Sequence, residues 1–190
     1  MSIIGITGGI GSGKSVVAQI LLSMGYPVYD SDAEAKQIMQ TDDAVRAQLT
    51  AAFGTDIYTH NRLNNKLLAE IAFANPLQLQ NLNNIVHPAV KQHLREWAKK
   101  QKSPVLFLES AILFESGFES ETDGVILVTA PLKTRINRVI QRDKCSREQV
   151  LQRMSQQWTE DAKTTKADYI VINDDYHSLI TQTEEIIAQL

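Results

Sequence analysis

The chain has 190 residues, of which 43% are hydrophobic and 22% charged, and its net charge is −3. This length suits one core with small insertions, and the negative net charge argues against a dedicated nucleic-acid surface. With Cys145 as its one cysteine, the sequence excludes a disulfide framework and a thiolate metal cluster. There is no leader-like segment and no apolar run near ~18 residues, so we expect a cytoplasmic protein with no membrane partner.

The first predicted strand, 3–7, runs directly into a glycine-rich segment and then into a helix. Four residues match the spacing G-x-x-x-x-G-K-[ST] of a phosphate-binding loop (P-loop): Gly8, Gly13, Lys14 and Ser15. The backbone N–H groups of such a loop line an anion-binding concavity, and the helix N-terminus adds further donors. The dinucleotide pattern G-x-G-x-x-G fails, because Lys14 stands at its last glycine. We therefore predict a nucleoside triphosphate site.

A second short strand, 27–29, ends in Asp30, Ser31 and Asp32, and a helix follows at once. Ligands of parallel α/β sheets bind at the carboxyl ends of the strands. We therefore expect both acids on the same rim as the P-loop, where a carboxylate can act on an acceptor. The alternative is that they only cap the helix or lie in solvent.

The segment 40–102 is predicted to be helical, without a convincing strand. Asn75 and Pro76 have the residue types preferred at the N-cap and first position of a long helix. The segment is too long for one crossover between strands, so we interpret it as a helical insertion that carries substrate contacts. His87, which precedes Pro88, is the candidate contact; a structural role in the helix is the alternative.

Three further strands are predicted at 104–108, 124–128 and 168–172, each followed by helical sequence. Continuous apolar runs of this kind are typical of strands covered on both faces. Five such strands alternating with helices predict a P-loop NTPase fold, a three-layer α/β/α class with a five-stranded parallel sheet. Its core would span about 1–39 and 103–190 of a single domain.

The segment 138–157 is basic in a chain of negative net charge. It reads as two helices joined by a turn, and Ser146 with Gln149 forms a capping box for the second helix. We predict a helical lid here, because the fork of an arginine grips phosphate oxygens in pairs. A solvated helical hairpin is the alternative. The candidate arginines are Arg138, Arg142 and Arg153.

The markers of other P-loop classes are missing. A GTPase needs a guanine-reading Asn-Lys-x-Asp, and 65–68 fails at its last position. A mechanical ATPase usually has an apolar strand that ends in Asp-Glu, which Glu109-Ser110 does not match. A kinase for a small acceptor remains. The alternative outside the enzymes is a module that binds ATP without transferring phosphate.

The sequence resembles the dephospho-CoA kinase family from its first predicted strand to its last. The resemblance rests on segments 6–15, 30–32, 87–88, 112–115 and 167–173, and on the lid arginines with Gln157. Thr7-Gly8-Gly9 at the start of the P-loop is more distinctive than a bare P-loop motif. The chain departs from the family at Val16, Lys36 and Ala111, where Thr, Arg and Pro are usual.

The resemblance implies transfer of the γ-phosphoryl group of ATP to the ribose 3′-hydroxyl of dephospho-CoA. The products would be coenzyme A and ADP, in the last step of coenzyme A biosynthesis. ATP and Mg²⁺ would be required, and dephospho-CoA would be the small-molecule partner. The alternative is a nucleotide kinase or another small-metabolite kinase. The oligomeric state stays open.

The resemblance also implies roles for individual residues. Asp32 would orient the acceptor hydroxyl and act as its base, Lys14 would bind the transferred group, and Arg142 would close over the phosphates. The triphosphate would lie on Gly11, Ser12, Gly13, Lys14, Ser15 and Val16, with Ser15 on the metal and Asn173 near the adenine. The implied acceptor contacts are Asp32, His87, Leu113, Glu115, Arg138 and Arg153.

Overall fold

The computed structural model describes all residues from 1 to 190. The chain forms two compact units, one made of Met1–Asp30 with Gln101–Leu190 and the other of Ser31–Lys100. The second unit therefore begins at Ser31, and its first helix packs with the other helices of that unit. We had grouped residues 31–39 with the core, because no change in composition marks this boundary.

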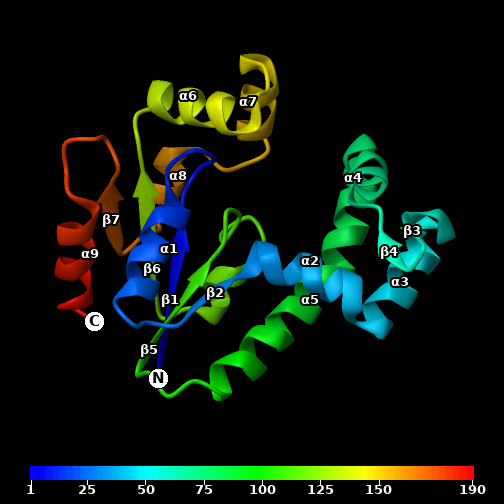
Figure 1. Ribbon diagram of the computed structural model, residues 1–190, viewed down its shortest axis with the longest axis horizontal. Helices are drawn as coiled ribbons and strands as arrows, with labels where there is room; N and C mark the ends of the chain where they lie inside the picture. Colours follow the sequence, from blue (N-terminus) through cyan, green and yellow to red (C-terminus); the bar gives the residue numbers. More distant parts are fainter. The chain divides into compact units, whose positions relative to one another are not determined.

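The first unit is built on a five-stranded parallel sheet in the order β2-β5-β1-β6-β7. Its strands are β1 (Ser2–Thr7), β2 (Val28–Asp30), β5 (Val105–Glu109), β6 (Gly124–Thr129) and β7 (Tyr169–Ile172). In the central strand β1, Gly5 pairs with Leu108 of β5 and Val125 of β6. The P-loop thus leaves the middle of the sheet, at the carboxyl edge where it was expected (Figure 1).

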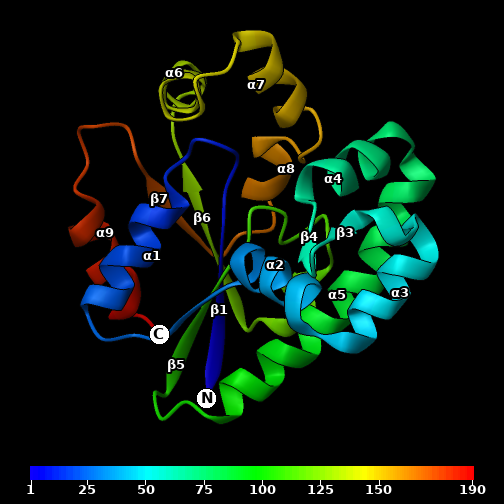
Figure 2. The same ribbon diagram turned by 45° about the vertical axis from the view of Figure 1, so that its right-hand side comes forward.

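Helices lie on both faces of this sheet, which confirms the three-layer α/β class. On one face α1 (Lys14–Ser23) and α9 (Leu179–Ile187) lie side by side (Figures 1 and 2). Ile4 and Ile6 of β1 belong to the buried cluster under these helices. A side chain at Gly5 would point to the opposite face, where Leu113 lies, because successive strand residues alternate. The other helices of this unit are η2 (Phe118–Glu121), α6 (Leu132–Asp143), α7 (Arg147–Met154) and α8 (Glu160–Thr164).

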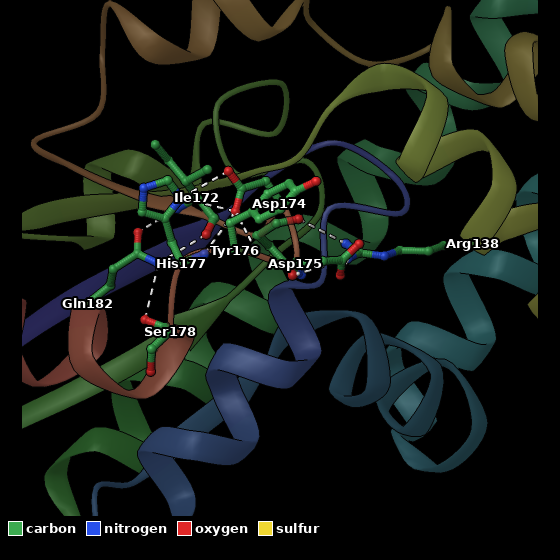
Figure 3. A network of polar contacts seen from close by, with 9 residues as sticks. Arg138, Ile172, Asp174, Asp175, Tyr176, His177, Ser178 and Gln182 are labelled. Carbon is green, nitrogen blue, oxygen red and sulfur yellow. Dashed lines mark hydrogen bonds and ion pairs between the residues drawn. The ribbon is translucent and has the colours of Figure 1, made fainter.

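Strand β7 is an edge strand, and our expectation that it is covered on both faces was wrong. Ile170 and Ile172 are 45% and 38% exposed, whereas Val171 between them is fully buried. The outward positions are also apolar, so the sequence hides the alternation. Gln182 of α9 partly covers the strand edge, since its amide accepts from the Ile172 N–H (2.8 Å) and donates to the Ile172 carbonyl (3.0 Å) (Figure 3).

The second unit is helical and is organised around α5. Its elements are α2 (Ser31–Thr41), α3 (Asp43–Phe53), η1 (Thr55–Ile57), α4 (Asn65–Ala74) and α5 (Pro76–Lys99). Helices α2, α3 and α4 all pack against α5, whose buried face carries Val86, Val90 and Leu94. Asn75 caps α5 by accepting from the Leu77 N–H at 2.9 Å, and Pro76 opens the helix, as predicted. No helix of either unit has both the length and the apolar composition needed to span a bilayer.

A small antiparallel hairpin in the second unit was not predicted. It consists of β3 (Tyr58–Thr59) and β4 (Arg62–Leu63). Each strand has only two residues, too few to show an alternating pattern. Its turn residues His60 and Asn61 take positive φ values of 50° and 64° without a glycine to signal them.

Candidate active site

Two glycines of the P-loop occupy positions that exclude a side chain. Gly11 has a φ of +81° and Gly13 a φ of +97°. A Cβ on Gly11 would lie 2.5 Å from the carbonyl oxygen of Arg135, and one on Gly13 would strike the amide of Asn173. The start of α6 and the end of β7 therefore pack directly on the loop. The result is a tight turn at the N-terminus of α1, which is the geometry of an anion-binding loop.

Ser15 and Glu109 bring two oxygen atoms together beside this turn. The Ser15 hydroxyl donates to Oε1 of Glu109 at 3.2 Å, and Glu109 is the buried last residue of β5. Mg²⁺ is typically bound by one or two protein oxygens together with substrate phosphates, so this donor set fits the ion. Sequence reasoning missed Glu109, because we searched that strand only for an Asp-Glu pair.

Asn173 supports the P-loop from the end of β7. Its buried amide donates to the Ser12 carbonyl at 2.8 Å. Arg138 of α6 donates to both the carbonyl and the side-chain oxygen of Asn173, at 3.3 and 3.2 Å. Asn173, expected near the adenine, thus contacts the P-loop itself and links it to Arg138, the first arginine of the predicted lid.

The turn after Asn173 is ordered by short-range polar contacts (Figure 3). Arg138 reaches Asp175 at 2.8 Å, and Asp174 accepts from the N–H groups of Tyr176 and His177. The bond from the His177 N–H is the main reason why the pKa of Asp174 lies below its ordinary value. The turn is therefore preorganised beside the P-loop.

The other two arginines of the predicted lid meet on one carboxylate. Arg142 at the end of α6 binds Asp143 at 2.7 Å, and Arg153 in α7 binds the same carboxylate at 2.7 Å. The bond from Arg142, followed by that from Arg153, holds the pKa of Asp143 below its ordinary value. Ser146 and Gln149 form the predicted capping box of α7. The hairpin α6–α7 thus carries two mostly exposed guanidinium groups, and both are bound to Asp143.

A polar network beneath the P-loop was missed by sequence reasoning. Arg135 of α6 is 7% exposed; its Nε donates to the Ile10 carbonyl at 3.2 Å. The guanidinium also pairs with Glu160 of α8, which accepts from the hydroxyl of Thr129. These residues are up to 150 positions from one another along the chain. The one sequence signal is that Arg135 falls on the buried face of α6, next to Ile136 and one turn before Val139.

Leu113 and Glu115, both expected beside the acceptor, make contacts inside the first unit. Leu113 is fully buried against Gly5. Glu115 pairs at 2.8 Å with Lys163 of α8, which is 1% exposed. It also accepts from the Trp158 N–H at 2.8 Å. Both side chains are thus held in place by contacts within the first unit.

Asp32 and His87 belong to the second unit. Asp32 is exposed in the first turn of α2, two residues after β2 ends. His87 is half-buried in α5. Its burial, followed by the charge of Lys91, lowers the pKa of His87 below its ordinary value. The helix thus favours a neutral imidazole, which can both donate and accept a hydrogen bond.

These features define a P-loop nucleotide-binding kinase fold. They are a parallel sheet with a P-loop after its central strand, a Ser–Glu oxygen pair and a helical hairpin that carries arginines. The sequence model of one family, described as dephospho-CoA kinase, matches residues 2–178. The chain belongs to this dephospho-CoA kinase family.

Individual relatives agree with this membership. A dephospho-CoA kinase from Bacteroides fragilis is 44% identical over 188 residues, covering 98% of this chain and 92% of the relative. A crystal structure from Thermus thermophilus matches with a TM-score of 0.89 and 38% identity, over 100% of this chain and 97% of that one. A dephospho-CoA kinase structure from Campylobacter jejuni matches with a TM-score of 0.71 and 26% identity, over 98% and 96% of the two chains.

Proposed function

We propose that the chain transfers the γ-phosphoryl group of ATP to the ribose 3′-hydroxyl of dephospho-CoA. The observation that carries this proposal is a built phosphate site in a member of the dephospho-CoA kinase family. A bond forms between the acceptor oxygen and the γ-phosphorus, and the bond from that phosphorus to the β–γ bridging oxygen breaks. ADP leaves, and the hydroxyl proton passes to a base. Such transfer depends mainly on positioning and charge stabilisation.

On the donor side, we assign the triphosphate to the P-loop. Gly11 to Val16 supply backbone N–H groups, and Lys14 neutralises charge on the transferred group. The turn behind them is held rigid by Asn173, which donates to the Ser12 carbonyl. Mg²⁺ would be held by the hydroxyl of Ser15, with Glu109 beside it, and would supply charge neutralisation on the phosphates.

On the acceptor side, we assign Asp32 as the group that orients the 3′-hydroxyl and accepts its proton. His87 and the other polar residues of the helical unit would bind the rest of dephospho-CoA. The α6–α7 hairpin would act as a lid. On closure, Arg142 would leave Asp143 and bind phosphate oxygens, with Arg138 and Arg153 nearby. A closed lid excludes water and so prevents wasteful hydrolysis of ATP. The use of ATP and the lack of paired cysteines favour the cytoplasm as its location.

A coupled assay of ADP release, run with different acceptors, tests the proposal. Purified protein with ATP and Mg²⁺ should release ADP rapidly with dephospho-CoA and slowly with nucleoside monophosphates or without acceptor. Phosphorylation of a nucleoside monophosphate in preference to dephospho-CoA would instead establish a nucleotide kinase. ATP binding without any acceptor-dependent ADP release would establish a binding module. Omission of Mg²⁺ from the active mixture tests the assigned metal requirement.

A further inference from the structure

Ile10 in the P-loop is held through both of its backbone groups. Its N–H donates to Oε1 of Gln157 at 2.8 Å, and its carbonyl accepts from Nε of Arg135 at 3.2 Å. A backbone N–H makes one strong hydrogen bond. The Ile10 N–H is therefore committed to Gln157, and the orientation of that peptide group is fixed by a side chain distant in sequence.

The two side chains that hold Ile10 lie at the two ends of the α6–α7 hairpin. Arg135 lies in the first turn of α6, and Gln157 follows the end of α7 by three residues. Gln157 also donates from its Nε2 to the Ala111 carbonyl at 3.0 Å, and the buried Lys163 donates to the same carbonyl at 3.3 Å. Both ends of the Gln157 amide are thus bound. The P-loop cannot shift without breaking these bonds or moving Gln157.

We propose that Gln157 is a positioning residue that holds the P-loop ready for the triphosphate and couples nucleotide binding to the end of the α6–α7 hairpin. This inference rests on the proposed function, since it takes ATP as the ligand of the loop. Gln157 acts through Ile10 rather than on the phosphates. Its two hydrogen bonds join the phosphate loop, the segment after β5 and the chain that leaves α7.

Gln157 offers a cleaner test than Arg135. Removal of the Arg135 guanidinium would leave the carboxylate of Glu160 without its buried partner, and such losses are strongly destabilising. Gln157 is neutral and half-buried. Its replacement by methionine keeps the length of the side chain and removes both hydrogen bonds. The neighbouring Gln156 is exposed, so Gln156→Met is the matched control.

A built-in fluorophore reports on the same place. Trp158 directly follows Gln157, is 40% exposed, and stacks on Phe114 with ring centroids 5.9 Å apart. The chain has 2 tryptophans, and the other, Trp97, lies in α5. A Trp97→Phe background therefore makes Trp158 the single tryptophan. ATP titrations in this background follow the segment that holds Gln157.

The first experiment compares Gln157→Met and Gln156→Met in the Trp97→Phe background. Gln157→Met should raise the KM for ATP about tenfold, as the loss of two hydrogen bonds implies. The KM for dephospho-CoA should stay unchanged, and the change in Trp158 emission on ATP binding should be lost. Gln156→Met should match the background in all three measurements. A lower melting temperature with an unchanged KM for ATP and an unchanged emission response would overturn the proposal.

Hydrogen exchange on the wild-type protein gives a second test that needs no folded variant. Saturating ADP should slow exchange in peptides covering 9–13 and 155–159 together. Protection of 9–13 with unaltered exchange at 155–159 would also overturn the coupling. Failure of the background protein to phosphorylate dephospho-CoA would count against the proposed function instead, because that assay contains an intact Gln157.

Discussion

Gly11 shows how a single P-loop position is restricted by both conformation and space. Its φ is +81°, and the backbone of Arg135 lies where a side chain would start. Gly25 after α1 provides a matched comparison, because its φ is +89° but nothing lies within 4 Å of its would-be Cβ. The two glycines therefore separate the cost of the left-handed conformation from the cost of the clash.

We predict that Gly11→Ala destabilises the protein clearly more than Gly25→Ala. The left-handed conformation alone costs about 1–2 kcal/mol, which both variants share. The clash at Gly11 should add about 1–3 kcal/mol, as overpacking typically does. Urea denaturation gives both free energies of unfolding. Equal losses in the two variants would show that the loop and the start of α6 separate at no cost.

At the residue scale, local spacing predicted the P-loop but not the side chains that support it. Gly8, Gly13, Lys14 and Ser15 lie within eight positions and form a motif that is legible in one dimension. Asn173 was expected on the nucleotide, and its contact with the Ser12 carbonyl spans 161 positions. Contacts between residues so far apart along the chain depend on the order of strands in the sheet, which no local pattern encodes.

A buried ion pair holds helix α8 against the rest of the first unit. Lys163 of α8 and Glu115 lie 2.8 Å apart and are 1% and 13% exposed. Removal of one partner leaves an uncompensated charge in the interior, which is more costly than the pair itself. The exposed pair Lys66–Glu70 in α4, at 3.9 Å, provides the contrast.

We predict that Lys163→Met lowers the free energy of unfolding by about 3 kcal/mol or more. The double variant Lys163→Met/Glu115→Gln should recover part of this loss, because no buried charge then remains unpaired. Lys66→Met should change stability by less than about 0.5 kcal/mol. Chemical denaturation of the four proteins, including the wild type, measures these differences. A Lys163→Met variant as stable as Lys66→Met would contradict the assigned role of the pair.

Helix α5 contains a histidine whose protonation should weaken the fold. Burial keeps the folded-state pKa of His87 below the ordinary 6.5, with a further contribution from Lys91. The stability that this group contributes is therefore complete above pH 6.5 and is lost as the pH falls from there through the lower folded-state pKa.

We predict that the difference in thermal stability between the wild type and His87→Gln depends on pH. The wild type should lose more thermal stability than the variant between about pH 7.5 and about pH 5.5, because glutamine does not titrate. Differential scanning fluorimetry at both pH values compares the two proteins. Parallel losses would mean that His87 takes up its proton as readily in the folded chain as in the unfolded one.

At the element scale, helices that carry their own start signals were predicted well. Asn75 with Pro76, and Ser146 with Gln149, place a cap and its partner within a few residues. The hairpin 58–63 was not predicted, because its strands are short and residues of the surrounding helices, such as Gln40 and Arg46, bind it. Strand β7 was found, but its edge position depends on sheet order.

At the scale of the whole molecule, the chain leaves its sheet after β2 and returns to it at β5. The first unit is therefore assembled from two separate segments, whereas the second is one continuous segment. The residues proposed for the phosphate donor belong to the first unit. Asp32, proposed for the acceptor, is the second residue of the other unit. This division suggests that donor and acceptor functions can be impaired separately.

We predict that Lys14→Ala and Asp32→Asn fail in different ways. Lys14→Ala removes a charge that stabilises the transferred group, so kcat should fall about a hundredfold or more and ATP should bind more weakly. Asp32→Asn keeps the size of the side chain but removes the base, so turnover should fall while the Kd for ATP stays at the wild-type value. Isothermal titration with ATP and the coupled ADP assay, run on both variants, distinguish the two effects. Unchanged turnover in Asp32→Asn would remove Asp32 from the reaction, whereas weakened ATP binding in that variant would move it to the donor side.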